Sequence, residues 1–134
     1  MNHTTLREDF DRIDASIGLW ERRLAAGEAV ALEPALEAAT QAALALIRAY
    51  VAAEGHKPVP GEDVGLLEAF KVLVKGDPSW NAVRDNLREL VYYRNCLAAN
   101  RMDALPAAPE KMAIRLARHV YLYVRTRCER EGRV

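Results

Sequence analysis

The sequence is poor in cysteine and contains no low-complexity segment and no long uninterrupted apolar run. Its 134 residues include only Cys96 and Cys128, too few for a disulfide framework or a zinc-binding cluster. The longest apolar run, around residues 41–51, is interrupted by Arg48 and is too short to cross a membrane. The polar, acidic N-terminus does not resemble a signal peptide. We therefore expect a cytoplasmic protein with reduced thiols and no membrane association.

An excess of charge of one sign is also absent, because 19 Lys and Arg residues are balanced by 19 Asp and Glu residues. Bulk charge therefore gives no argument for a nucleic-acid partner. The balance hides an asymmetry, since basic side chains outnumber acidic ones in residues 57–134 and the reverse holds in residues 1–56. Any anion-binding surface is thus expected in the C-terminal half of the chain.

The composition and the periodicity predict one all-α domain that spans residues 1–134. About half of the residues are hydrophobic (51%) and 28% are charged, which is the balance of a globular chain of single-domain length. Every convincing pattern is helical, and no segment alternates for long enough to predict a sheet.

Five helices are expected from start signals, stop signals and apolar spacing. They run from the Thr5-x-x-Glu8 capping box to Gly27, from about Pro34 to Gly55, from Asp63 to Lys75, from Asp77 to about Asn100, and from the 105–109 break to about Arg130. Helices joined by such short loops predict an antiparallel up-and-down bundle.

Arg94 is the first position that a simple bundle does not explain. On a helical wheel it falls in the middle of an apolar stripe that contains Val83, Leu87 and Leu90. A guanidinium there needs an anionic partner, a water-filled cleft or an interface, because an unpaired buried charge is costly. Two interpretations stay open: a structural Arg that reaches the edge or pairs with a carboxylate such as Asp14, or a residue of a binding site or interface.

The last helix carries a basic stripe. Lys111, Arg115, Arg118, Leu122 and Arg125 follow one another at steps of four, three, four and three, with no acidic residue between Lys111 and Arg127. Such a stripe can follow a phosphate backbone. The alternative is a solvated face that acidic residues of the first helix balance.

Other residues with chemical potential have simpler explanations. His119 lies among apolar residues and is expected to be a hydrogen-bonded core or interface residue rather than a catalyst. Trp80, Tyr92 and Tyr93 are expected to pack rather than to stack on bases. No metal-ligand spacing, glycine-rich phosphate loop or nucleophile elbow is present, so neither a metal nor a cofactor is expected.

The segment LRELVYYRNCLA at residues 87–98 resembles the HEPN superfamily, a group of small all-helical domains found in prokaryotic toxin–antitoxin modules, defence systems and RNA processing. The signature of that family is an Arg, often followed by Asn, with a His a few residues later on the penultimate helix. An Ala/Leu-rich helix that ends at Gly55 and the proline-containing loop after it are also similar. The resemblance covers about residues 35–130.

In that family two protomers pair so that the signature helices face each other, and RNA is cut in the shared cleft without a metal. The resemblance therefore implies a homodimer, with a further partner protein such as a nucleotidyltransferase. It implies an RNA- or phosphate-binding cleft at Arg94, Asn95, Asn100 and Arg101, flanked electrostatically by Lys111, Arg115, Arg118 and Arg125.

The signature His is missing from this chain. Ala99, Asn100 and Arg101 occupy the positions where it would stand, and none of them is a general acid or base near neutral pH. We therefore expect a non-catalytic HEPN-like domain that binds RNA, a nucleotide or a protein partner. Two alternatives are an active metal-independent ribonuclease toxin that uses another residue, and a helical scaffold with no nucleic-acid role.

Overall fold

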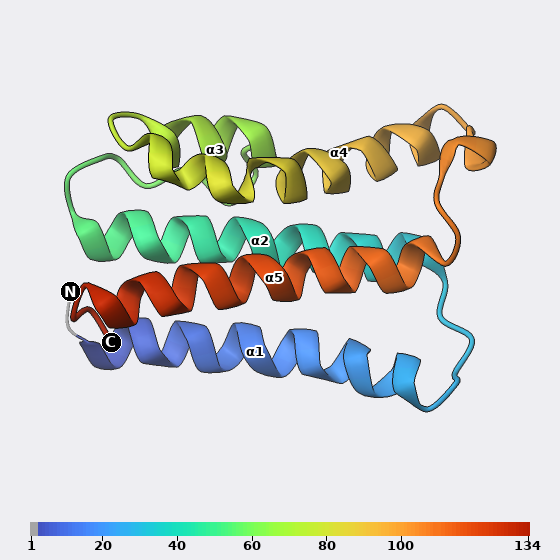
Figure 1. Ribbon diagram of the computed structural model, residues 1–134, viewed down its shortest axis with the longest axis horizontal. Coiled ribbons are helices and arrows are strands. Elements are labelled where there is room, and N and C mark those ends of the chain that lie inside the picture. The colour runs from blue at the N-terminus through green and yellow to red at the C-terminus, as the bar shows by residue number, and fades with distance from the viewer. Residues whose placement is uncertain (1–2) are drawn as a thin grey trace.

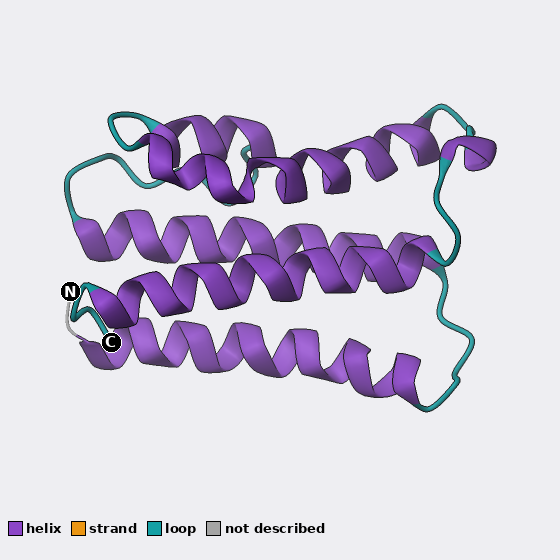
Figure 2. Cartoon of the chain, in the orientation of Figure 1, coloured by secondary structure: helices purple, strands orange, loops and turns teal. Residues whose placement is uncertain are grey.

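The computed structural model describes residues 3–134, and the chain is all-helical over that range (Figures 1 and 2). Its five α-helices are α1 (His3–Ala25), α2 (Leu32–Glu54), α3 (Leu66–Val74), α4 (Arg84–Ala98) and α5 (Pro109–Arg130). Two short 3-10 helices, η1 (Pro78–Val83) and η2 (Met102–Ala104), precede α4 and α5 respectively. The predicted all-α class and the five helices are confirmed.

The four long helices lie alongside one another, and α3 is a short helix beside the start of α4 (Figure 1). The chain runs in opposite directions along α1 and α2, whereas α2 and α5 run the same way. As a result α1 begins and α5 ends at the same end of the bundle. Within residues 3–134 no helix combines the length and the apolar character needed to cross a membrane.

The core is built around α2, which contacts each of the other four α-helices. Small side chains on its buried positions, such as Ala35, Ala39 and Ala43, allow the neighbouring helix axes to approach closely. Larger apolar residues of the other helices then fill the space between them, among them Phe10, Ile17, Leu73, Leu87, Leu90, Val120 and Val124. The helices therefore share one continuous core.

Three predicted helix starts differ from the structure. α1 begins at His3, so Thr5 lies inside the helix and the predicted capping box is wrong. α3 begins at Leu66 rather than at Asp63. Asp77 does act as an N-cap, since its Oδ1 accepts a hydrogen bond from the Ser79 N–H at 3.3 Å, but it caps η1. The α-helix proper starts only at Arg84, after the 3-10 turns.

A half-buried ion cluster fixes the end of α5. The Arg127 side chain is only 12% exposed, and its guanidinium lies 4.1 Å from the centre of the Trp80 ring. It binds the Asp77 carboxylate, donates to Ser79 Oγ at 2.7 Å, and pairs with the Glu131 carboxylate at 3.0 Å. We call Arg127, Asp77 and Glu131 the C-terminal anchor, because they join the last turn of α5 to η1.

Tyr50 extends this anchor to α2. The Tyr50 hydroxyl donates to the Glu131 carboxylate at 2.9 Å. The Tyr50 and Trp80 rings pack edge to face, with their centroids 4.7 Å apart. Burial, and then the hydrogen bond to Glu131, raise the pKa of Tyr50 to about 12. Burial raises the pKa of Glu131, but hydrogen bonds from Arg133, Arg127 and Tyr50 outweigh it, so that the pKa lies below its usual value. Near neutral pH the Glu131 carboxylate is therefore ionised, whereas the Tyr50 hydroxyl keeps its proton and donates it to that carboxylate.

Candidate functional site

Arg94 is exposed, and does not lie within an apolar stripe as the helical wheel predicts. The buried residues of α4 are Leu87, Leu90, Tyr93 and Cys96, each three positions after the last. A step of three residues turns by about 300°, so the buried stripe rotates by about 60° per step and moves away from Arg94. The wheel assumes a straight stripe, whereas α4 packs against α2, α3 and α5.

Arg94 lines a groove of about 340 Å³ between α2 and α4. We call this the α2–α4 groove; its lining residues are Glu33, Leu36, Glu37, Arg94, Leu97 and Ala98. Within residues 3–134, Arg94 forms no salt bridge. Pairing with Asp14 is excluded, because that carboxylate binds the Arg118 guanidinium at 2.6 Å.

The α2–α4 groove carries both signs of charge. Glu33 and Glu37 lie one helical turn apart and line the same groove as Arg94. Neither of them forms a salt bridge with a described residue; Glu37 accepts only a hydrogen bond from the Gln41 amide at 3.1 Å. Two carboxylates beside one guanidinium make the groove less favourable for a phosphate and suit it to a protein surface of mixed charge.

The other residues predicted for the cleft do not line this groove. Asn95, Asn100 and Arg101 are all exposed near the end of α4. The Arg101 guanidinium is held by both oxygens of the Asp103 carboxylate, each at 3.0 Å. Ala99, one of the positions where the family signature has His, is the exposed C-cap residue of α4.

Asn100 has a structural role that the sequence interpretation did not include. It adopts a left-handed conformation with φ of 53°, and its N–H donates to the Leu97 carbonyl at 3.1 Å. The following N–H, of Arg101, donates to the Cys96 carbonyl at 2.8 Å. This pair of bonds is a Schellman motif, in which Gly or Asn is preferred at the left-handed position. Asn100 therefore closes α4.

This role predicts how substitutions at Asn100 will behave. We expect Asn100→Ala to lower the free energy of unfolding by about 1 kcal/mol, because alanine tolerates the left-handed conformation less well. Asn100→Gly is the matched control and should preserve stability, since glycine adopts that conformation without strain. Urea denaturation followed by circular dichroism measures both. Equal stability of the two variants would contradict a closing role for Asn100.

The basic stripe of α5 divides into paired and unpaired cations. Arg118 lies between two carboxylates of α1, at 2.6 Å from Asp14 and 2.8 Å from Glu21. Arg125 donates to the Tyr121 hydroxyl at 2.6 Å and approaches the Glu129 carboxylate at 3.7 Å. The alternative in which acidic residues of the first helix balance this face is thus confirmed at Arg118. Two predicted flank residues are already engaged within the chain.

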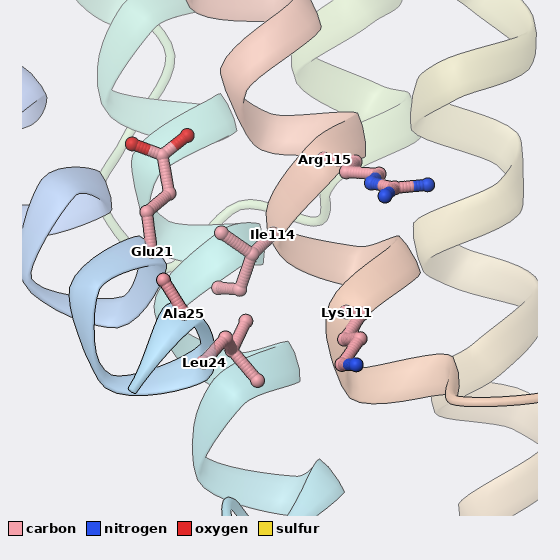
Figure 3. A pocket seen from close by; sticks show the side chains of 6 residues that line it. All are labelled: Glu21, Leu24, Ala25, Lys111, Ile114 and Arg115. Atoms are coloured by element: carbon pink, nitrogen blue, oxygen red, sulfur yellow. The ribbon is translucent and has the colours of Figure 1, made fainter. Parts of the chain in front are cut away.

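The remaining two cations of the stripe, Lys111 and Arg115, are exposed and form no salt bridge with a described residue. They border a pocket of about 330 Å³ together with Glu21, Leu24, Ala25 and Ile114. Figure 3 shows Leu24 and Ile114 close together in the centre of this pocket, with the three charged side chains around them. The Arg115 side chain points away from Leu24 and Ile114.

The aromatic and histidine predictions have mixed outcomes. Trp80 and Tyr93 are buried, which confirms their predicted packing role. Tyr92 is 45% exposed, and its hydroxyl donates to the Ala104 carbonyl at 3.0 Å, across to η2. His119 is exposed, so of its two predicted places the core is wrong, and a place at an interface stays a prediction. It lies on the solvent side of α5, next to the buried Val120.

The cysteines are not placed for nucleophilic catalysis, and the described residues form no metal-binding cluster. Cys96 and Cys128 are both buried free thiols, and burial raises the pKa of Cys128 to about 12. A thiol with so high a pKa is protonated near neutral pH and is a poor nucleophile. In the described part of the chain, no three His, Cys, Asp or Glu side chains are placed to hold a metal ion.

The sequence interpretation did not identify Glu33 and Glu37 as site residues. Their spacing of four gave a usable signal, because it places both carboxylates on the same face of α2. The spacing does not reveal that this face of α2 lies beside Arg94 of α4.

Comparison with protein-family models, with curated proteins and with solved structures found no match for this chain.

Proposed function

We propose that this chain is a non-catalytic, HEPN-like binding domain that forms a two-fold homodimer through the α2–α4 groove. The observation that carries the proposal is the exposed groove in which Arg94 lies with Glu33 and Glu37 around apolar side chains. In a two-fold interface the same patch meets itself, so that patch must supply both members of every contact. A surface that carries both signs of charge meets this requirement.

The pairing gives each charged group of the groove a counterpart. Arg94 of one copy meets Glu33 and Glu37 of the second copy, and the symmetric contacts form at the same time. Leu97, which is partly exposed, and the exposed Ala98 line the groove and supply a small apolar centre, whereas Leu36 forms its buried floor. An apolar centre with charged groups around it is the usual organisation of a protein interface.

Charge and side-chain chemistry favour protein binding over RNA cleavage at this place. Glu33 and Glu37 reduce the attraction of Arg94 for phosphate, and Asp103 holds Arg101. At positions 99–101 the chain has Ala, Asn and Arg, which cannot exchange a proton near neutral pH. The proposal therefore takes the HEPN resemblance as a resemblance of fold and pairing, without the ribonuclease chemistry.

The first test is the oligomeric state. We expect sedimentation equilibrium and light scattering to give the mass of a dimer at micromolar concentrations, with dissociation on dilution. A monomer at about 100 μM would overturn the proposal, because dissociation constants weaker than that correspond to less than about 5.5 kcal/mol of binding free energy.

A second measurement separates this proposal from an active ribonuclease. Purified wild-type protein and the Arg94→Ala variant are incubated with labelled cellular RNA without metal ions. We expect neither protein to cleave the RNA. Cleavage by the wild type that Arg94→Ala abolishes would replace the proposal with that of a ribonuclease that works without the signature His.

A further inference from the structure

A second groove, lined by residues of α1 and α5, runs between these two helices. The pocket of Figure 3 adjoins one of about 420 Å³, because Glu21 and Ala25 line both. The second pocket adds Asp14, Ala15, Gly18, Arg22 and Arg118 to the lining. We call the two together the α1–α5 groove. It shares no lining residue with the α2–α4 groove.

The α1–α5 groove has an excess of positive charge. Its two carboxylates, Asp14 and Glu21, are both engaged by Arg118. The other three cations of the lining, Arg22, Lys111 and Arg115, form no salt bridge with any residue from 3 to 134. All three are exposed. The groove therefore presents three cations without internal partners beside a neutralised acidic pair.

Small residues leave the wall of this groove open. Ala15, Gly18 and Ala25 line it on the α1 side. Glycine inside a helix costs about 1 kcal/mol relative to alanine, so Gly18 is not explained by helix propensity. A methyl group at Gly18 would lie 3.3 Å from Arg22 Nη1. The absence of a side chain at Gly18 leaves room for the Arg22 guanidinium to lie against the α1 backbone, while Ala15 and Ala25 keep the rest of this wall low.

Two exposed leucines border the cations. Leu19 is 51% exposed and Leu122 is 54% exposed, and they are two of the five large apolar side chains that are exposed among the described residues. Helix spacing places Leu19 three positions before Arg22 on α1, and Leu122 four positions after Arg118 on α5. Each leucine is thus a surface neighbour of a residue that lines the groove.

We infer that the α1–α5 groove is a docking site for an acidic, amphipathic helical segment of a partner protein. Carboxylates of such a segment pair with Arg22, Lys111 and Arg115, and its apolar side chains cover Leu19 and Leu122. The small residues Ala15 and Ala25 let the segment approach α1. RNA is less suitable, because its phosphates would pair with the cations but would leave the two exposed leucines uncovered.

The test uses a defined peptide as probe. An 18-residue helical peptide with leucine on one face and glutamate on the other is compared with a twin in which lysine replaces every glutamate. Fluorescence anisotropy measures affinity, and ¹H–¹⁵N shift changes of the full chain locate the bound peptide. We expect the glutamate peptide to bind and to shift resonances of α1 and α5 around Gly18 and Arg115, and the lysine peptide not to bind.

Charge reversal then identifies the contacts. Lys111→Glu with Arg115→Glu is expected to weaken binding by about tenfold or more, which corresponds to about 1.4 kcal/mol. Lys71→Glu with Lys75→Glu changes the net charge by the same amount outside the groove, and should leave the affinity within about twofold. Leu122→Ser is expected to weaken binding severalfold. Circular dichroism establishes that every variant is folded.

Several outcomes would overturn the inference. They are failure of the glutamate peptide to bind, shift changes confined to other helices, equal losses in the two charge-reversal pairs, and an unchanged affinity of Leu122→Ser. Displacement of the peptide by single-stranded polyuridine that binds more tightly would assign the groove to RNA instead. None of these outcomes depends on whether the chain forms a dimer through the α2–α4 groove.

Discussion

Replacing Arg127 with methionine is expected to lower the free energy of unfolding by about 2 to 3 kcal/mol. Arg127 is the only cation that contacts both Asp77 and Glu131 among the described residues, so its loss leaves two partly buried carboxylates without that partner. Removing one member of a buried ion pair typically costs about 3 to 5 kcal/mol. About a third of each carboxylate side chain is exposed, which reduces the penalty. The substitution also removes the guanidinium from the face of Trp80.

A matched control lies two residues earlier on the same helix. Arg125→Met removes a side chain that is 35% exposed, together with its 3.7 Å ion pair with Glu129 and its hydrogen bond to the Tyr121 hydroxyl. The loss there should be about 1 kcal/mol, because the surface ion pair contributes little and the single hydrogen bond contributes about 1 kcal/mol. Urea denaturation monitored by circular dichroism and by tryptophan fluorescence compares the two variants. A loss for Arg127→Met no greater than that for Arg125→Met would show that the C-terminal anchor contributes little.

The second large effect is expected at the proposed dimer interface. Arg94→Glu should weaken self-association by about 100-fold or more, because each copy of the groove would then present three carboxylates to the other. Opposed like charges at an interface cost several kcal/mol, and a 100-fold change corresponds to about 2.7 kcal/mol. Sedimentation equilibrium measures the dissociation constant. Since Arg94 is exposed and forms no salt bridge with any residue from 3 to 134, the helical content of the variant should not change.

Charge exchange provides the sharper form of this test. Glu37→Arg alone should also weaken the dimer, whereas Arg94→Glu combined with Glu37→Arg restores opposite charges across the two-fold and should recover much of the affinity. Arg88→Glu is the control, because Arg88 is exposed on the same helix but does not line the α2–α4 groove. If Arg94→Glu stays dimeric, or if Arg88→Glu dissociates equally, the interface lies elsewhere.

Much of the fold could be predicted because the signals are local. Gly55 closes α2 with a positive φ, and the proline at position 109 opens α5, as their positions in the sequence predict. The 3-10 turns of η1 were not predictable in this way. Asp77-Pro78 signals the start of a 3-10 helix as well as that of an α-helix, so the sequence does not distinguish the two. In the structure this segment is a 3-10 helix, and its Trp80 and Val83 are buried in the core.

The candidate site was less predictable because it depends on which helix faces meet. Arg94 was identified from its pattern, but its exposure follows from the rotation of the buried stripe along α4, which a single helix does not reveal. The partners of Arg118 lie about 100 positions earlier in the chain, and Arg127 and Asp77 are 50 positions apart. Spacing within one helix identifies a charged residue, whereas its partner is determined by the arrangement of the bundle.

The shared location of the start of α1 and the end of α5 has a practical consequence for measurements on surfaces. Both grooves lie toward the opposite end of the bundle (Figure 1). The α2–α4 groove is formed by the first turns of α2 and the last turns of α4, and the α1–α5 groove by the second half of α1, from Asp14 on, and the first half of α5, up to Arg118. A biotin or a fluorophore attached beyond either helix end would therefore project away from both grooves. Immobilised through such a tether, the bundle would present its two candidate binding surfaces to the solution, and an affinity measured on a sensor chip should agree with the value in free solution.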